Sequence, residues 1–216
     1  HLNRYLSANL ASQPEKWQKA LYEFLKLHQL HGVQLLLDGG VIRNVVELET
    51  ALEYAMDAVE RTSGRDDMVR LKSKLRTLGF LDGWGNSAAR ILETMNLLQD
   101  ILEQPNEETL EEFLARIPMV SKVALISPHG WFAQENVLGR PDTGGQVVYV
   151  LDQARALERF LADDLRHAGL DIDPMILIVT RLIPDNEGTT SNQRLEKVWQ
   201  TKNVWILRVP FRDADN

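Results

Sequence analysis

A pair of glycines, Gly144 and Gly145, stands directly before a stretch with helical periodicity and is the strongest chemical signal in the sequence. Glycines allow a ligand to approach the backbone closely, and the free amides of a first helical turn carry partial positive charge. Such a helix start suits a phosphate group or a sugar hydroxyl. The alternative is a tight turn that binds nothing, and the pattern alone does not decide between the two.

Three polar residues accompany the glycines. His129 follows a strand-like run, and its ring can reach the same crevice or make a structural hydrogen bond. Gln146, in the first helical turn, can donate to and accept from a polyol, or simply be solvated. Arg181 follows a second strand-like run and suits an anionic ligand, although a surface ion pair is favoured. His129, Gly144, Gly145 and Gln146 are therefore the candidates for substrate binding, with the structural alternatives still open, and no residue other than His129 is a candidate for a catalytic role.

Several other kinds of site lose support. The glycine pair is part of neither a Gly-x-Gly-x-x-Gly motif nor a loop ending in Gly-Lys-Ser/Thr, which disfavours dehydrogenases and P-loop enzymes. His28 and His31 have helical spacing, but no third ligand lies nearby in the sequence, so we expect no metal site. No Ser/His/Asp arrangement and no pair of glycosidase-like carboxylates is recognisable from spacing.

The candidate residues lie in and beside a long loop, residues 127–145, between a strand-like run and a helix-like run. Strand-to-helix connections usually take roughly 2 to 6 residues, and longer ordered loops are usually functional. The loop follows the carboxyl end of a strand, which is where open α/β sheets place their ligands. Its position therefore favours the ligand-binding interpretation of the glycines.

The second half of the chain has the order strand, loop, helix, strand. Apolar runs at 122–126, 175–180 and 204–209 predict strands, and residues 146–167 predict a helix. The run at 175–180 is continuously apolar, which predicts a strand of a parallel sheet that is buried on both faces. Together these elements predict an α/β fold, the opening part of a Rossmann-like domain over residues 119–216.

Residues 1–118 have helical periodicity and predict an all-α module of roughly five or six helices. Gly79 is placed to end one helix in the left-handed conformation. Asn86 or Ser87 can cap the next helix, and Asn106 caps the last one. We therefore expect two parts with different architecture.

Composition narrows the class of protein further. The 216 residues are 44% apolar, which is enough for a real core, and contain no cysteine, so disulfides and thiolate metal sites are excluded. The net charge of -7 argues against nucleic-acid or anionic-membrane binding. No apolar run approaches the roughly 20 residues of a membrane span, and no signal peptide is recognised at the start. The lack of cysteine is compatible with a reducing compartment such as the cytoplasm, and we expect this chain to be a piece of a larger protein.

The amino-acid sequence of the loop and the following helix resembles that of a known protein family. The segment reads Ser-Pro-His-Gly-Trp-Phe-Ala-Gln-Glu-Asn-Val-Leu-Gly-Arg-Pro-Asp-Thr-Gly-Gly-Gln-Val-Val-Tyr-Val-Leu-Asp-Gln-Ala-Arg-Ala-Leu-Glu. It resembles the sucrose synthase family of retaining GT-B glycosyltransferases. Ile-Leu-Ile-Val-Thr-Arg-Leu-Ile-Pro-Asp and Ile-Leu-Arg-Val-Pro-Phe-Arg are similar to the same family, as are Leu-Gly-Phe-Leu-Asp-Gly-Trp-Gly-Asn-Ser-Ala and Phe-Leu-Ala-Arg-Ile-Pro-Met-Val upstream. The resemblance covers essentially the whole chain.

This resemblance implies reversible transfer of glucose between a nucleoside diphosphate and fructose, without a metal or other cofactor. It implies UDP or ADP, their glucose conjugates, fructose and sucrose as ligands, and a homotetramer formed through the helical module. Gly144 and Gln146 would contact the fructosyl acceptor, Gly145 would lie against the diphosphate, and His129 would line the acceptor side. The family's cationic and glutamate groups belong to a second lobe, so we expect this piece alone to be inactive.

Three alternatives stay open. Sucrose-phosphate synthases share the His-Gly and Gly-Gly-Gln elements, although the helical module favours sucrose synthase. In the second alternative the chain serves as a helical interaction module of a larger nucleotide-sugar-binding protein. In the third it belongs to a different nucleotide-sugar-binding or nucleotide-binding Rossmann protein that shares only the glycine-rich turn.

Overall fold

The computed structural model describes residues 14–62, 65–140, 143–185 and 187–210. The chain forms two compact units. The first unit comprises His1–Met119 together with Leu165–Asp171, and the second comprises Val120–Asp164 together with Ile172–Asn216.

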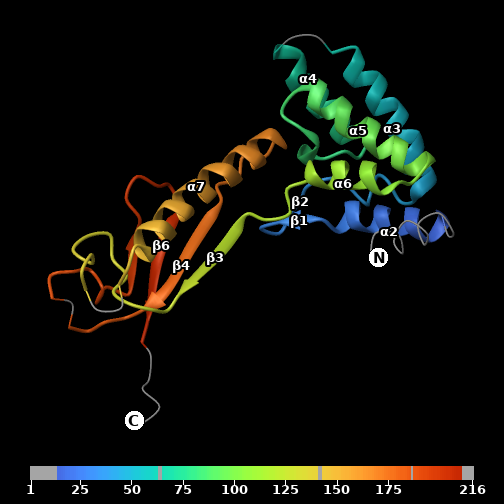
Figure 1. Ribbon diagram of the computed structural model, residues 1–216. Coiled ribbons are helices and arrows are strands. Elements are labelled where there is room, and N and C mark those ends of the chain that lie inside the picture. Colours follow the sequence, from blue (N-terminus) through green and yellow to red (C-terminus); the bar gives the residue numbers. More distant parts are fainter. Residues whose placement is uncertain (1–13, 63–64, 141–142, 186, 211–216) are drawn as a thin grey trace. The chain divides into compact units, whose positions relative to one another are not determined.

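The first unit is helical, as its periodicity predicts (Figure 1). Its described α-helices are α2 (Pro14–Leu27), α3 (Val45–Glu60), α4 (Arg65–Thr77), α5 (Ala88–Glu103) and α6 (Glu107–Ala115). Asn44, Ser87 and Asn106 cap α3, α5 and α6, each accepting a hydrogen bond from the backbone amide three residues ahead. This satisfies a donor that a helix start leaves free. Of the two cap candidates for α5, Ser87 is therefore the correct one.

Gly79 ends the segment that follows α4 with φ +93°, as predicted. The amide of Phe80 then donates to the carbonyl of Leu75 at 2.9 Å, a bond typical of a glycine-terminated helix. A short 3-10 helix, η1 (Asp82–Trp84), follows. The ring of Trp84 is fully buried, and its Nε1 donates to the carbonyl of Leu36 at 2.9 Å.

The first unit also holds a small antiparallel hairpin that the periodicity does not reveal, β1 (Gln29–Leu30) with β2 (Val33–Gln34). His31 and Gly32 form the two-residue turn with φ of 54° and 78°. Positive φ at both central residues is the hairpin geometry that matches strand twist. Strands of two residues are too short to show an alternating pattern, so only the His-Gly pair was available as a signal.

The second unit is a four-stranded sheet in the order β3-β4-β6-β5, with helix α7 (Gln146–His167) against it (Figure 1). The strands are β3 (Lys122–Ser127), β4 (Met175–Arg181), β5 (Leu195–Lys197) and β6 (Val204–Val209). β3, β4 and β6 are parallel, which confirms the α/β prediction, and β5 adds an antiparallel edge that the sequence analysis missed.

One face of the sheet packs against α7. Alternate residues of β4 and β6 point to this face and are buried with Val147, Leu151 and Ala154 of the helix. The opposite residues of β4, including Leu177 and Val179, are only partly buried. The prediction of a strand buried on both faces is therefore wrong for this chain, because no helix among the described residues of the second unit covers the second face.

Candidate functional site

The candidate site lies at the carboxyl ends of the three parallel strands, within the second unit. The loop from Pro128 to Gly145 leaves β3 at this edge and returns to the start of α7. A second loop, residues 182–194, leaves β4 at the same edge and leads to β5. Parallel pairing therefore brings both loops to one end of the sheet, where ligands bind in open α/β folds.

A row of three polar side chains underlies these loops. Ser127, Thr180 and Arg208 are aligned across β3, β4 and β6 by the strand register and are 4%, 1% and 1% exposed. All three occupy the alternation that points to the α7 side. Buried polar groups normally have hydrogen-bond partners, and Ser127 and Arg208 have them. The Oγ1 of Thr180 has none among the described residues.

Gln146 connects the start of α7 to this row. Its Nε2 donates to the Oγ of Ser127 at 3.0 Å, while the residue itself remains exposed. The carbonyl of Gly145 accepts from the amide of Tyr149 at 3.0 Å, so Gly145 occupies the N-cap position directly before α7. The first helical amides beyond it have no partner within their own helix.

Gly144 and Gly145 are both exposed, and neither adopts a positive φ. No described atom lies within 4 Å of a β-carbon built on either residue. Backbone conformation and packing within the described chain therefore do not explain why these two residues are glycine. This observation weighs against the alternative of a glycine-requiring tight turn.

His129 and Arg181 lie at the same end of the sheet, and both are exposed. Among the described residues, neither side chain has a hydrogen-bond or ion-pair partner, although the backbone of Arg181 pairs with β6. The surface ion pair favoured for Arg181 is therefore absent from the described part of the chain. The structural hydrogen bond offered as the alternative for His129 is likewise not seen there.

The long loop is held by contacts of its own. The amide of Trp131 donates to the Oγ1 of Thr143 at 2.7 Å, which joins the two ends of the loop. The guanidinium of Arg140 lies 4.9 Å from the ring centre of Trp131 and pairs with the carboxylate of Glu187 in the second loop. Asn136 donates to the carbonyl of Gly188 at 3.2 Å, so the two loops are joined at two places.

Comparison with protein-family models matches residues 108–216 to the first GT-B domain of sucrose synthase. Residues 1–86 match the sucrose synthase EPBD domain. The chain belongs to the sucrose synthase family.

Individual relatives agree with this assignment. The chain is 47% identical over 98% of its length to a sucrose synthase of Thermosynechococcus vestitus and 50% identical over 98% to one of Nitrosomonas europaea. It is 49% identical over 98% of its length to a sucrose synthase of Solanum tuberosum. The chain spans about a quarter of the length of these curated relatives, 26% of each.

Arg208 and Glu196 are the residues near the site that the sequence analysis overlooked. Their side chains are 0% and 9% exposed and form an ion pair of 2.5 Å. A signal was present, because Arg208 continues the inward alternation of Val204 and Ile206 in an apolar strand. A charged residue at an inward position rarely occurs without a partner.

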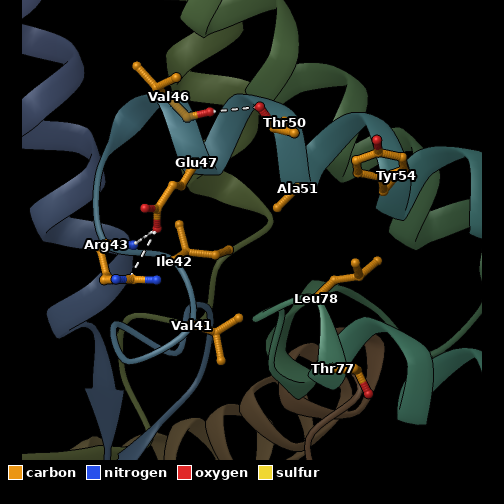
Figure 2. Close-up of a pocket in the computed structure, with 10 residues that line it drawn as sticks. All are labelled: Val41, Ile42, Arg43, Val46, Glu47, Thr50, Ala51, Tyr54, Thr77 and Leu78. Carbon is orange, nitrogen blue, oxygen red and sulfur yellow. Dashed lines mark hydrogen bonds and ion pairs between the residues drawn. The ribbon is translucent and has the colours of Figure 1, made fainter.

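The EPBD-matching part of the chain holds a separate pocket of about 360 Å³ (Figure 2). Val41, Ile42 and Leu78 supply much of its apolar lining, and Tyr54 stands at one end. None of the predicted site residues lines it.

Among the described residues, no group of three or more His, Cys, Asp and Glu side chains is arranged to hold a metal ion. No helix in the described ranges has the length and apolarity needed to span a membrane.

Proposed function

We propose that the protein is a sucrose synthase that transfers glucose reversibly between a nucleoside diphosphate and fructose. The reaction is NDP-glucose plus fructose to sucrose plus NDP, with retention at the glucose anomeric carbon. The observation that carries the proposal is the identity of about half of all residues, over nearly the whole chain, to proteins named sucrose synthase. The match of residues 108–216 to the first GT-B domain of that family supports it.

The proposed site roles follow the loop and the helix start. Gly144 and Gln146 contact the fructosyl acceptor, Gly145 lies against the diphosphate, and His129 lines the acceptor side. The free space in front of both glycines supports close approach of a ligand to the backbone. The exposure of His129 and Gln146 leaves their polar atoms accessible to sugar hydroxyls.

The helix start also suits the proposed chemistry. Negative charge develops on the diphosphate as its bond to glucose breaks, and helical amides with partial positive charge stabilise it. α7 has 22 residues, so its N-terminus carries the full effect of a helix dipole. By resemblance to the family, further cationic groups come from the second lobe, and the 216-residue chain alone is inactive.

The proposed function includes the ligands, the cellular location and the oligomeric state of the protein. The nucleotide is UDP or ADP, the sugars are glucose, fructose and sucrose, and no metal or other cofactor takes part. The protein acts in the cytoplasm, binds no nucleic acid, and forms a homotetramer through its helical module. We place the division between helical module and GT-B domain at residues 118 and 119.

The test is a sucrose-cleavage assay of the full-length protein with UDP or ADP, in which the release of fructose and NDP-glucose is measured. We expect both products in equal amounts. The synthesis direction, run with fructose and with fructose 6-phosphate as competing acceptors, separates the two glycosyltransferase alternatives. Preference for the phosphorylated acceptor would assign the protein to the sucrose-phosphate synthase class instead.

A further inference from the structure

We propose that the buried pair Arg208–Glu196 is a positioning device for the sugar-binding loop, a role that rests on the proposed function. Arg208 is the last inward-facing residue of β6, and Glu196 lies on the antiparallel edge strand β5. Neither residue belongs to the loop that carries His129 and the two glycines. Both act on that loop through hydrogen bonds to Phe132 and Gln134.

The guanidinium of Arg208 makes a fork to a single carbonyl of the loop. Its Nε and Nη2 donate to the carbonyl of Phe132 at 3.1 Å and 2.9 Å. Its Nη1 donates to the carbonyl of Gln193 in the second loop at 2.9 Å. A planar group with several fixed donors fixes the position of such a carbonyl more narrowly than a single ammonium does.

The carboxylate of Glu196 accepts hydrogen bonds from Arg208 and from two other side chains. It pairs with Arg208 and accepts from the Nε2 of Gln134 at 2.5 Å and from the Oγ1 of Thr190 at 2.7 Å. The amide of Trp199 in turn donates to the Oε1 of Gln134 at 2.7 Å. The loop segment around Gln134 is thus tied to β5 and to the residues that follow it.

Only a few residues and one hydrogen bond separate the Arg208–Glu196 pair from the candidate site. Phe132 is fully buried and follows Trp131, whose amide donates to the Oγ1 of Thr143. Thr143 precedes Gly144 directly. A displacement of the Phe132 carbonyl therefore moves both the His129 side and the glycine side of the loop.

A contribution to stability does not by itself explain why a buried ion pair occupies this position. A buried ion pair can often be replaced by apolar residues of similar size without loss of stability, whereas removal of one partner is costly. The pair lies beside the candidate site, and its hydrogen bonds end on the loop that forms it. These two facts favour a role in fixing the loop over a role in the core.

The experiment uses the full-length protein with the apolar double variant Arg208→Met/Glu196→Leu, beside Arg208→Gln and Glu196→Gln. Thermal unfolding, kcat and KM for sucrose, and amide hydrogen exchange of residues 128–145 are measured. We expect the single variants to lose stability and the double variant to regain part of it, since no unpaired charge remains but the carbonyls of Phe132 and Gln193 lose their donor. In the double variant KM for sucrose still rises about tenfold or more, since small displacements at a site are costly, and the loop exchanges faster.

Glu158→Gln is the matched control. Glu158 is also a buried carboxylate of the second unit, but its hydrogen bonds among the described residues come from the amides of Lys202 and Asn203 and not from the loop. This variant is expected to lower stability while KM for sucrose and loop exchange stay unchanged. A double variant that folds and has wild-type KM and wild-type loop exchange would overturn the proposal.

If the double variant does not fold, Gln134→Ala tests the positioning role instead. It removes the bonds to Glu196, Lys197 and Trp199 from the loop side and leaves the ion pair in place. A raised KM with an unchanged unfolding temperature supports the positioning role, and an unchanged KM contradicts it. If the wild-type protein cleaves no sucrose, the proposed function fails, while hydrogen exchange of the loop still decides whether the pair anchors it.

Discussion

The backbone of Gly169 lies so close to the carbonyl of Gly85 that a β-carbon at position 169 would stand 2.4 Å from that oxygen. Gly169 follows α7 with φ +85°, and both residues belong to the first unit. Nearby, the amide of Asn86 donates to the carbonyl of His167 at 3.0 Å. The turn after α7 is therefore fixed by backbone contacts that leave no room for a side chain.

The first prediction concerns this contact. Gly169→Ala should lower the free energy of unfolding by roughly 2–4 kcal/mol, because it adds both an unfavourable φ and a steric overlap with backbone. Denaturant unfolding followed by circular dichroism measures the change. The control is Gly32→Ala in the hairpin turn, where φ is 78° and no described atom lies within 4 Å of the added β-carbon. It should cost only about 1 kcal/mol. Equal losses would show that crowding at position 169 is relieved without cost.

The second prediction concerns Gly145. Gly145→Ala should change the free energy of unfolding by less than about 1 kcal/mol, since the residue has ordinary φ and open space around it. If the glycine serves ligand approach, sucrose cleavage by the full-length protein should fall by about 100-fold. Gly32→Ala should show the converse, with reduced stability and normal turnover. Full activity of Gly145→Ala would return the glycine pair to the turn interpretation.

The third prediction separates the two roles of Gln146, whose side chain bonds to Ser127 and is also exposed. Gln146→Ala should weaken sugar binding by about tenfold, as expected for the loss of a polar contact to a ligand. Ser127→Ala frees the Gln146 side chain without removing it and should weaken binding only about two- to threefold. Titration calorimetry with fructose in the presence of UDP measures both. Equal effects would mean that Gln146 acts only through its bond to Ser127.

The fourth prediction concerns the cap of α6. Asn106 accepts from the amide of Thr109 at 2.9 Å, so Asn106→Ala should cost about 1 kcal/mol of unfolding free energy. Asn106→Asp keeps an acceptor at the helix start and should retain nearly full stability. Thermal unfolding of both variants gives the comparison. A loss in Asn106→Asp as large as in Asn106→Ala would show that the cap bond contributes little.

The features that the sequence predicted correctly depend on neighbours along the chain. The cap at Asn106 and the end at Gly79 act on amides and carbonyls a few residues away, so local residue types are sufficient to locate them. The parallel strands and α7 carry clear apolar periodicity. The loop after β3 was located from its length and position between them.

The features that were missed depend on residues far apart in the chain. Arg208 meets Phe132 across a separation of 76 residues, which no local pattern records. β5 has three residues with only one half-buried position, so it shows no apolar alternation and is defined by its pairing with β6. The apolar residues on the second face of β4 predict a covered face, yet burial depends on what packs there.

The row of Ser127, Thr180 and Arg208 exists only because three strands share one register. A one-residue insertion or deletion inside β4 would turn Thr180 to the opposite face and bring Val179 or Arg181 into the row. The strand packing beneath the hydrogen bonds of Ser127 to Gln146 and of Arg208 to Phe132 would then be distorted. Natural length variation should therefore be confined to the loops, and the three parallel strands should align without gaps wherever this site is retained.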